Sequence, residues 1–173
     1  AKNTLSGIHR ATIDNSDVDA MAGGVSVSAT ANNTIDATAV AVGLSVAGSG
    51  GFGASVAVAG TEARTVMSNT VSSAVRNGSD VDASGAVSVY AEDSSNIKSD
   101  TSAASFSMAL SSSAAVSVSI AVPIAQNTVN SMTIATIDGS TVDGTTVSAI
   151  TLRNASIDAL GAAVSFSGGA SGG

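Results

Sequence analysis

The sequence predicts an all-β chain that forms a parallel β-solenoid, a β-helix-like stack built from repeats of about 62 residues with room for local hairpin extensions. Three observations lead there: an internal repeat, long stretches with period-two alternation, and an apolar content of 44% with three Phe, one Tyr and no Trp. Small and β-branched side chains suit thin sheet layers better than a globular core built on large anchors.

The repeat is visible as one sequence motif that occurs three times. The segment "NSDVDAMAGGVSVSAT" at 15–30 has a similar copy in "GSDVDASGAVSVYAED" at 78–93 and a more divergent copy in "GSTVDGTTVSAITL" at 139–152. We interpret residues 1–173 as a single repeat array of about 2.8 copies. Its units are 13–74, 75–136 and an incomplete 137–173, and residues 1–12 are the end of a preceding unit.

A weaker period lies inside the unit. The segment "IDALGAAVSF" at 157–166 matches "VDAMAGGVSV" at 18–27, and the long repeat places Ile157 opposite Ile35. Val18 and Ile35 therefore look like equivalent positions. We expect each unit to hold three turns of roughly 20 residues, which is a usual coil size for a parallel β-solenoid.

Residues 38–60 alternate strictly, as a strand does. Val40, Val42, Leu44 and Val46 lie on one side, Ala, Gly and Ser lie on the other, and 37–61 and 101–137 carry no charge. We expect both faces of these strands to be covered, the small-residue face by a close contact with another layer or chain. The spacing leaves open whether the strands at 38–60 form a hairpin or successive sides of a coil.

Carboxylates gather in the predicted turns. They are Asp14, Asp17, Asp19, Asp80, Asp82, Asp138 and Asp143. Asn77-Gly78 and Asp138-Gly139 supply residues that tolerate positive φ at sharp corners. We interpret the carboxylates as solvated turn residues and expect no cofactor. Calcium at these Asp-containing turns is the alternative, although the glycine-rich nonapeptide of calcium-binding solenoids is missing.

The composition argues against several functions. The net charge is −7 and the six Lys and Arg are scattered, so no basic patch is available for nucleic acid. His9 is the only histidine and there is no Cys, so the chain cannot form a His-based catalytic triad or a metal site with several His and Cys ligands. We assign no catalytic, cofactor-binding or metal-binding residue and expect no enzyme. Pro123 is expected at a strand end or sheet edge.

The sequence resembles a known group of proteins in its repeats. The phrases "IDNSDVDAMAGGVSVSAT" and "AVAVGLSVAGSGGFGASVAVAGTEARTVMSNTV" resemble repeats of very large bacterial surface and secreted proteins, the filamentous-haemagglutinin-like and autotransporter-type adhesins. The resemblance covers essentially the whole chain in pattern and composition. It implies a right-handed parallel β-solenoid that serves as a stalk, fibre or adhesive surface outside the bacterial cell.

The expected function is therefore a structural or adhesive extracellular module of a large bacterial surface or secreted protein. Its expected partners are further copies of itself, end to end or laterally, with host or matrix glycans as a further class. One alternative is a carbohydrate-binding or ice-binding solenoid surface, although Thr30, Thr34, Thr38 and Thr61 are irregularly spaced. Another alternative is a membrane-inserting β-hairpin protein, because 37–61 is uncharged.

Overall fold

The computed structural model describes residues 1–172 and shows a flattened, all-β parallel solenoid. The predicted fold class is confirmed. The strands are β1 (Lys2–Asp14), β2 (Asp17–Ala20), β3 (Val25–Ala31), β4 (Thr34–Ser49), β5 (Phe52–Arg76), β6 (Asp80–Ala83), β7 (Ala86–Asp93), β8 (Asn96–Ser111), β9 (Ala114–Val129), β10 (Met132–Asp138), β11 (Thr141–Asp143), β12 (Thr146–Arg153) and β13 (Ser156–Ser171).

Each 62-residue repeat makes one wide coil. Every pairing is parallel and joins residues about one repeat apart, such as Lys2 with Arg64 and Thr34 with Asn96. The expectation of three 20-residue turns per unit is wrong. Val18 lies in β2 and Ile35 in β4, which belong to different sheets, because strands of up to 25 residues take up the whole unit in one circuit.

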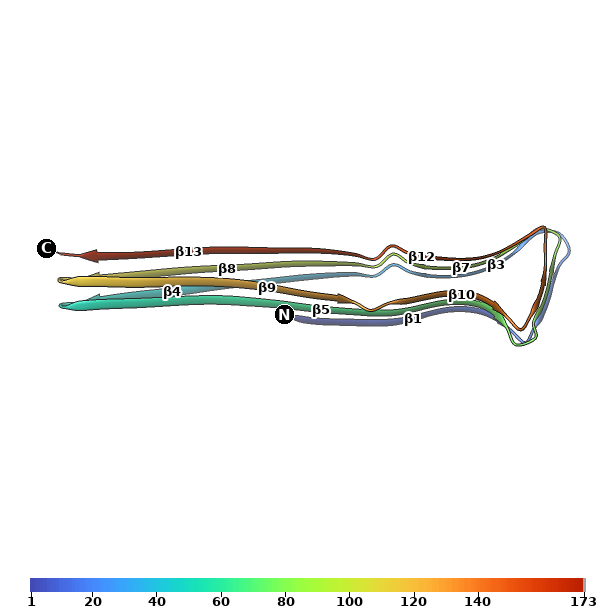
Figure 1. Cartoon of the computed structure of the whole chain (residues 1–173), viewed down its shortest axis with the longest axis horizontal. Coiled ribbons are helices and arrows are strands. Elements are labelled where there is room, and N and C mark those ends of the chain that lie inside the picture. The colour runs from blue at the N-terminus through green and yellow to red at the C-terminus, as the bar shows by residue number, and fades with distance from the viewer. Residues whose placement is uncertain (173) are drawn as a thin grey trace.

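The coils form two long layers with a short connecting sheet at one end (Figure 1). One layer contains β1, β5 and β10, with β9 also paired to β5. The other contains the sheets β3-β7-β12 and β4-β8-β13. The sheet β2-β6-β11 joins the layers at what we call the crossover end, and the turns after β4 and β8 form the opposite turn end. The molecule is therefore long along its strands and only three coils deep.

The strands at 38–60 are opposite sides of a coil and not a hairpin. β4 and β5 follow each other around a turn at Gly50 and Gly51, yet β4 hydrogen-bonds to β8 and β5 to β1, β9 and β10. The two strands face each other from different sheets. Their side chains, and not their backbones, meet between the layers.

The space between the layers is filled differently in the two halves of the molecule. Toward the crossover end the core is aliphatic, with Val27, Val75, Val81, Val87 and Val89 at its centre. Toward the turn end the inward side chains are Ala, Gly and Ser. There a Cβ on Gly43 would lie 2.6 Å from the carbonyl oxygen of Val58 in the facing layer. The layers are therefore too close for large inward side chains in this half.

One corner position has the left-handed conformation in every coil. Asn15, Asn77 and Gly139 follow the paired residues Asp14, Arg76 and Asp138, and their φ angles are 45°, 60° and 55°. Asn and Gly adopt this conformation at the least steric cost. The predicted positive φ is confirmed at Asn77, Gly78 and Gly139.

Pro123 lies inside β9, which pairs only with β5 among the described strands. The sheet-edge expectation is confirmed, and a strand end is not observed. Asn130 donates its N–H to Met67 of β5. Because backbone groups alternate sides along a strand, the even-numbered residues of β9 face β5 and residue 123 faces away. The missing N–H of proline therefore costs no hydrogen bond to β5.

Candidate interaction surface

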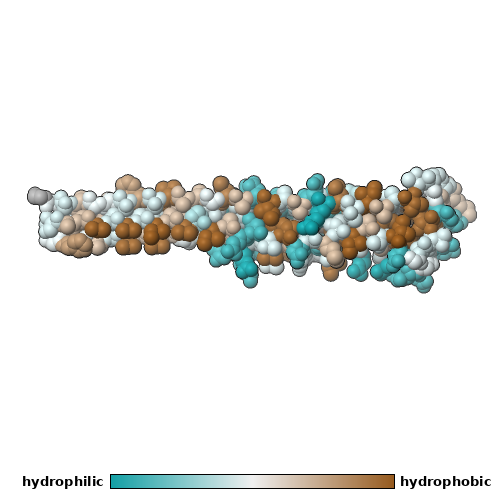
Figure 2. Space-filling model, in the orientation of Figure 1, coloured by the Kyte–Doolittle hydropathy of each residue, from teal (hydrophilic) through white to brown (hydrophobic). Residues whose placement is uncertain are grey.

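Large apolar side chains point outward along the turn half of the sheet β4-β8-β13. We call this surface the apolar face, and it consists of Val40, Val42, Leu44, Val46, Phe106, Met108, Leu110, Val164 and Phe166. A second apolar surface lies on the other side of the molecule, along the outward residues of β5 and β9 from Val56 to Ile124. Figure 2 shows brown apolar side chains of this second surface in a row over the uncharged half of the molecule.

The apolar face is uncovered. Leu44 is 72% exposed and Val164 is 67% exposed. Within one chain, the expectation that both faces of these strands are covered is wrong for the large residues and right for the small ones, which meet the facing layer inside the coil. The physical reason is the narrow gap at Gly43, which admits Ala, Gly and Ser only.

Serine hydroxyls hold the turn half together from within. Ser55 donates from Oγ to Oγ of Ser45 at 2.9 Å, and Ser107 donates to Oγ of Ser55 at 3.0 Å. Ser105 and Ser119 share a further hydroxyl hydrogen bond. Inward polar groups paired in this way lose little on desolvation, so the usual arrangement of apolar inside and polar outside is inverted here.

The apolar face has regular ladders. Leu44, Phe106 and Phe166 lie opposite one another on β4, β8 and β13, and the rings of Phe106 and Phe166 stack with centroids 5.3 Å apart. The coils pair through backbone hydrogen bonds in the plane of the sheet, so any further coil would add within that plane. Side chains that point out of that plane stay uncovered however many coils are added.

Charged residues begin at one level along the molecule. Asp36, Lys98 and Asp158 form a ladder on one layer, and Lys2 pairs with Arg64 on the other. Lys98 also lies 3.6 Å from Asp100. The charged residues nearest the turn end are Asp100 on one layer and Glu62 on the other, and the described strand residues between these two and the turn end carry no charge. An uncharged half is therefore separated from a charged half.

The predicted turn carboxylates lie at the crossover end. Asp19, Asp82 and Asp143 are exposed and face one another in register on β2, β6 and β11. Desolvation and the carboxylates of Asp80, Asp143, Asp19 and Asp17 raise the pKa of Asp82 above its ordinary value. Among residues 1–172 no group of three or more His, Cys, Asp or Glu side chains is placed to hold a metal ion.

Asp14 has a different environment from the Asp82 ladder. It accepts hydrogen bonds from Nδ2 of Asn77 at 2.6 Å and from Nη2 of Arg76 at 2.8 Å. These two partners, Asn77 first, hold the pKa of Asp14 below its ordinary value. The three side chains clamp neighbouring coils at the corner. Asp138, its counterpart in the third coil, pairs in register with Arg76.

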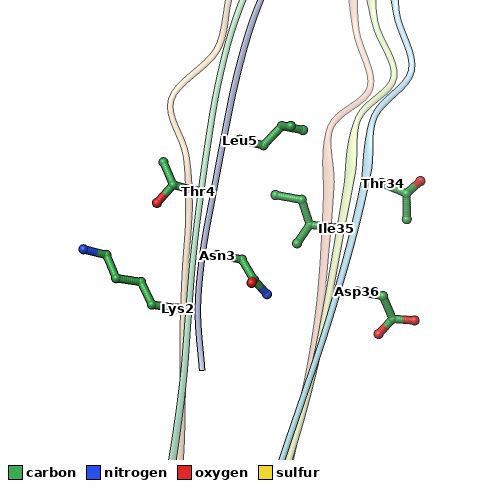
Figure 3. Close-up of a pocket in the computed structure, with 7 residues that line it drawn as sticks. All are labelled: Lys2, Asn3, Thr4, Leu5, Thr34, Ile35 and Asp36. Atoms are coloured by element: carbon green, nitrogen blue, oxygen red, sulfur yellow. The ribbon is translucent and has the colours of Figure 1, made fainter.

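A hollow opens between the layers at the edge of the first coil (Figure 3). Asn3, Leu5 and Ile35 point into the gap between the two ribbons, whereas Lys2, Thr4, Thr34 and Asp36 point away from it. Its inward groups are one amide and two aliphatic side chains. They include no acid, base or nucleophile.

The histidine and the threonines considered in the sequence analysis lie apart from one another. His9 is half-buried on the inward row of β1. Thr30 lies opposite Glu92, Thr34 opposite Asn96, Thr38 opposite Asp100 and Thr61 opposite Pro123, so these threonines form no column. The outward orientation of the apolar face was missed at the sequence level. Its signal was the glycine at 43 in the small-residue row, because a glycine inside a strand often marks a close backbone approach.

Comparison of the chain with protein-family models, with curated proteins and with solved structures finds no match. Over the described residues, no helix is long and apolar enough to cross a membrane.

Proposed function

We propose that this chain is a structural repeat module of a large extracellular bacterial protein, forming part of a stalk, fibre or adhesive surface. The observation that carries the proposal is the pairing of each coil with the next over its whole length. Val18, Val81 and Val142, for example, stand in one ladder. Each repeat of this kind adds one coil to the stack, so repetition of a simple sequence unit produces an extended structure.

The geometry favours assembly over chemistry. Each coil covers the backbone edge of its neighbour, and the unpaired edges of the described stack lie on its first and last coils and along residues 52–63 of β5. Such edges are sites for stacking on equivalent coils. The inward groups of the hollow between the layers contain no convergent acid, base or nucleophile. Placement outside a bacterial cell, an adhesive role and glycan partners rest on the resemblance of the repeats to those of the surface adhesins.

The alternatives have less support. A carbohydrate-binding or ice-binding surface in a solenoid needs regular rows of recognition residues, and the threonines at 30, 34, 38 and 61 stack on other residue types. A membrane-inserting hairpin needs β4 and β5 to satisfy each other's backbone groups, and these strands do not pair.

Negative-stain electron microscopy combined with sedimentation velocity over a range of concentrations tests the proposal. We expect slender particles that lengthen by edge-to-edge stacking as the concentration rises. Compact monomers alone at high concentration would contradict a polymerising module, and turnover of a polysaccharide by the purified chain would contradict a structural role.

A further inference from the structure

We infer that the apolar face of the sheet β4-β8-β13 is an interface for a second copy of this chain, which packs face to face on it as the second sheet layer of a sandwich. This inference deepens the proposed structural function, because it names the surface through which coils associate laterally. It concerns a different direction of assembly from the edge-to-edge stacking of coils.

The first argument is that nothing within the repeat architecture covers this face. Val40, Val42, Leu44 and Val46 are 63–77% exposed on β4, and Val164 and Phe166 are 67% and 57% exposed on β13. These side chains point out of the sheet, whereas new coils add within it. Contiguous apolar patches of this kind mark interaction sites in proteins.

The second argument is size. Residues 39–49 of β4 and their partners on β8 and β13 form three strands of eleven residues. At about 3.3 Å per residue and about 4.8 Å per strand, the face covers about 520 Å². Two such faces bury about 1,050 Å² in total, near the lower limit of specific interfaces. We expect a weak dimer from the described coils and a tighter one with every coil added.

The third argument is shape. Outward residues form parallel ridges in register, such as Leu44, Phe106 and Phe166, with grooves between them. Two flat sheets with ridges of this kind pack at about 10 Å with their strands nearly aligned. Because the same surface is used on both copies, a twofold axis relates them and the assembly closes as a dimer.

The fourth argument is charge. The chain has a net charge of −7, and like charges would oppose association of two copies. The charged residues of this layer begin at Asp36, Lys98, Asp100 and Asp158, beyond the apolar face. Face-to-face packing therefore buries no charge and keeps the carboxylates of each copy outside the contact.

A lipid bilayer fits the face less well than a second copy. The outer edges of β4 and β13 have unpaired backbone groups in the described stack, and hydrocarbon offers them no partner. The single tyrosine, Tyr90, lies on β7, and there is no tryptophan, so no aromatic belt borders the apolar half. A protein partner leaves these edges open to water.

Sedimentation equilibrium of the full chain and its variants tests the inference. We expect the dissociation constant of the wild-type dimer to rise at least tenfold in the double variant Leu44→Lys, Phe106→Lys. The matched control is Ile8→Lys, an outward residue of β1 in the charged half that is 75% exposed, and it should leave the constant unchanged. Circular dichroism checks that the fold is retained.

A second measurement uses a nearly native chain. The protein has no cysteine, so Ala104→Cys places one thiol on the central strand β8 of the apolar face, and Ser28→Cys places one on the outward side of β3 as the control. A short bis-maleimide should link Ala104→Cys chains into dimers and leave Ser28→Cys chains monomeric.

Three results would overturn the inference. One is a wild-type dissociation constant that the lysine substitutions do not change, together with equal cross-linking of both cysteine variants. Another is stacking into long particles that are a single chain wide in negative stain, in the wild type as in the face variants, which would preserve the proposed function and remove lateral pairing. The last is a monomer that floats with phosphatidylcholine–phosphatidylglycerol vesicles and loses this property in Leu44→Lys, Phe106→Lys, which would assign the face to lipid.

Discussion

Gly43 shows at the scale of one residue why the apolar side chains of this protein point outward. An added Cβ would meet the backbone of Val58 at 2.6 Å, and backbone cannot move aside as a flexible side chain can. The small residues in the inward row of β4 therefore let the two layers approach each other and form hydrogen bonds between serines. The larger residues that alternate with them do not fit between the layers and point outward.

We predict that Gly43→Ala destabilises the chain by about 1–3 kcal/mol, the usual cost of overpacking. The matched control is Gly48→Ala in the same strand, where nothing lies within 4 Å of the added Cβ. Urea unfolding followed by circular dichroism gives both values. Equal stability of the two variants would show that the layers are further apart than the structure places them.

At the scale of elements, the crossover sheet β2-β6-β11 carries a ladder of like charges. Asp19, Asp82 and Asp143 lie in register, and the raised pKa of Asp82 means that its charged form is disfavoured in the folded chain. The folded state therefore binds a proton at Asp82 more readily than the unfolded state does. By linkage, this group contributes stability that increases as the pH falls through its folded pKa.

We predict that Asp82→Asn stabilises the folded chain at pH 7, because the substitution removes the repulsion within the ladder. The advantage should shrink as the pH falls from above the raised pKa of Asp82 to below the ordinary carboxyl value of 3.8, where wild-type Asp82 is also neutral. Thermal unfolding of both proteins at several pH values measures this. A stability difference that is constant with pH would contradict it.

The pKa of Asp14, at the corner of the first coil, is shifted in the opposite direction from that of Asp82. Its pKa is lowered by hydrogen bonds from Asn77 and Arg76, so its contribution is present above the ordinary carboxyl value and is lost as the pH falls through the lower folded value. Asp14→Asn is therefore the control for the Asp82 experiment. It should destabilise the chain at pH 7 where Asp82→Asn stabilises it.

At the scale of the whole molecule, the coil of about 62 residues is the unit of stability. Parallel pairing between consecutive coils makes each added coil a nearest-neighbour increment, as in other repeat proteins. We predict that duplication of residues 63–124 adds one coil, raising the urea m-value and the melting temperature together. Duplication of a 20-residue segment, such as 80–99, should break the register and lower both. A lower m-value and melting temperature for the 62-residue duplication than for the 20-residue duplication would contradict one coil per repeat.

The sequence by itself determined the strand content, the repeat length and the pairs of residues that stand in one ladder. These follow from period-two alternation and from a repeat whose equivalent positions, such as Val18, Val81 and Val142, meet in parallel register. It also determined the corner at Asn77 and Gly78, because few residue types accept a positive φ.

Only the tertiary structure decided that a repeat makes one wide coil and that the large side chains between Val40 and Val46 face outward. Alternation shows that two faces differ but not which of them faces the other layer, since a strand can be turned over without any change in its period. That choice depends on the distance between β4 and β5, which come from different sheets and meet through Gly43. The exposed apolar face, and with it the candidate interface, results from that one distance.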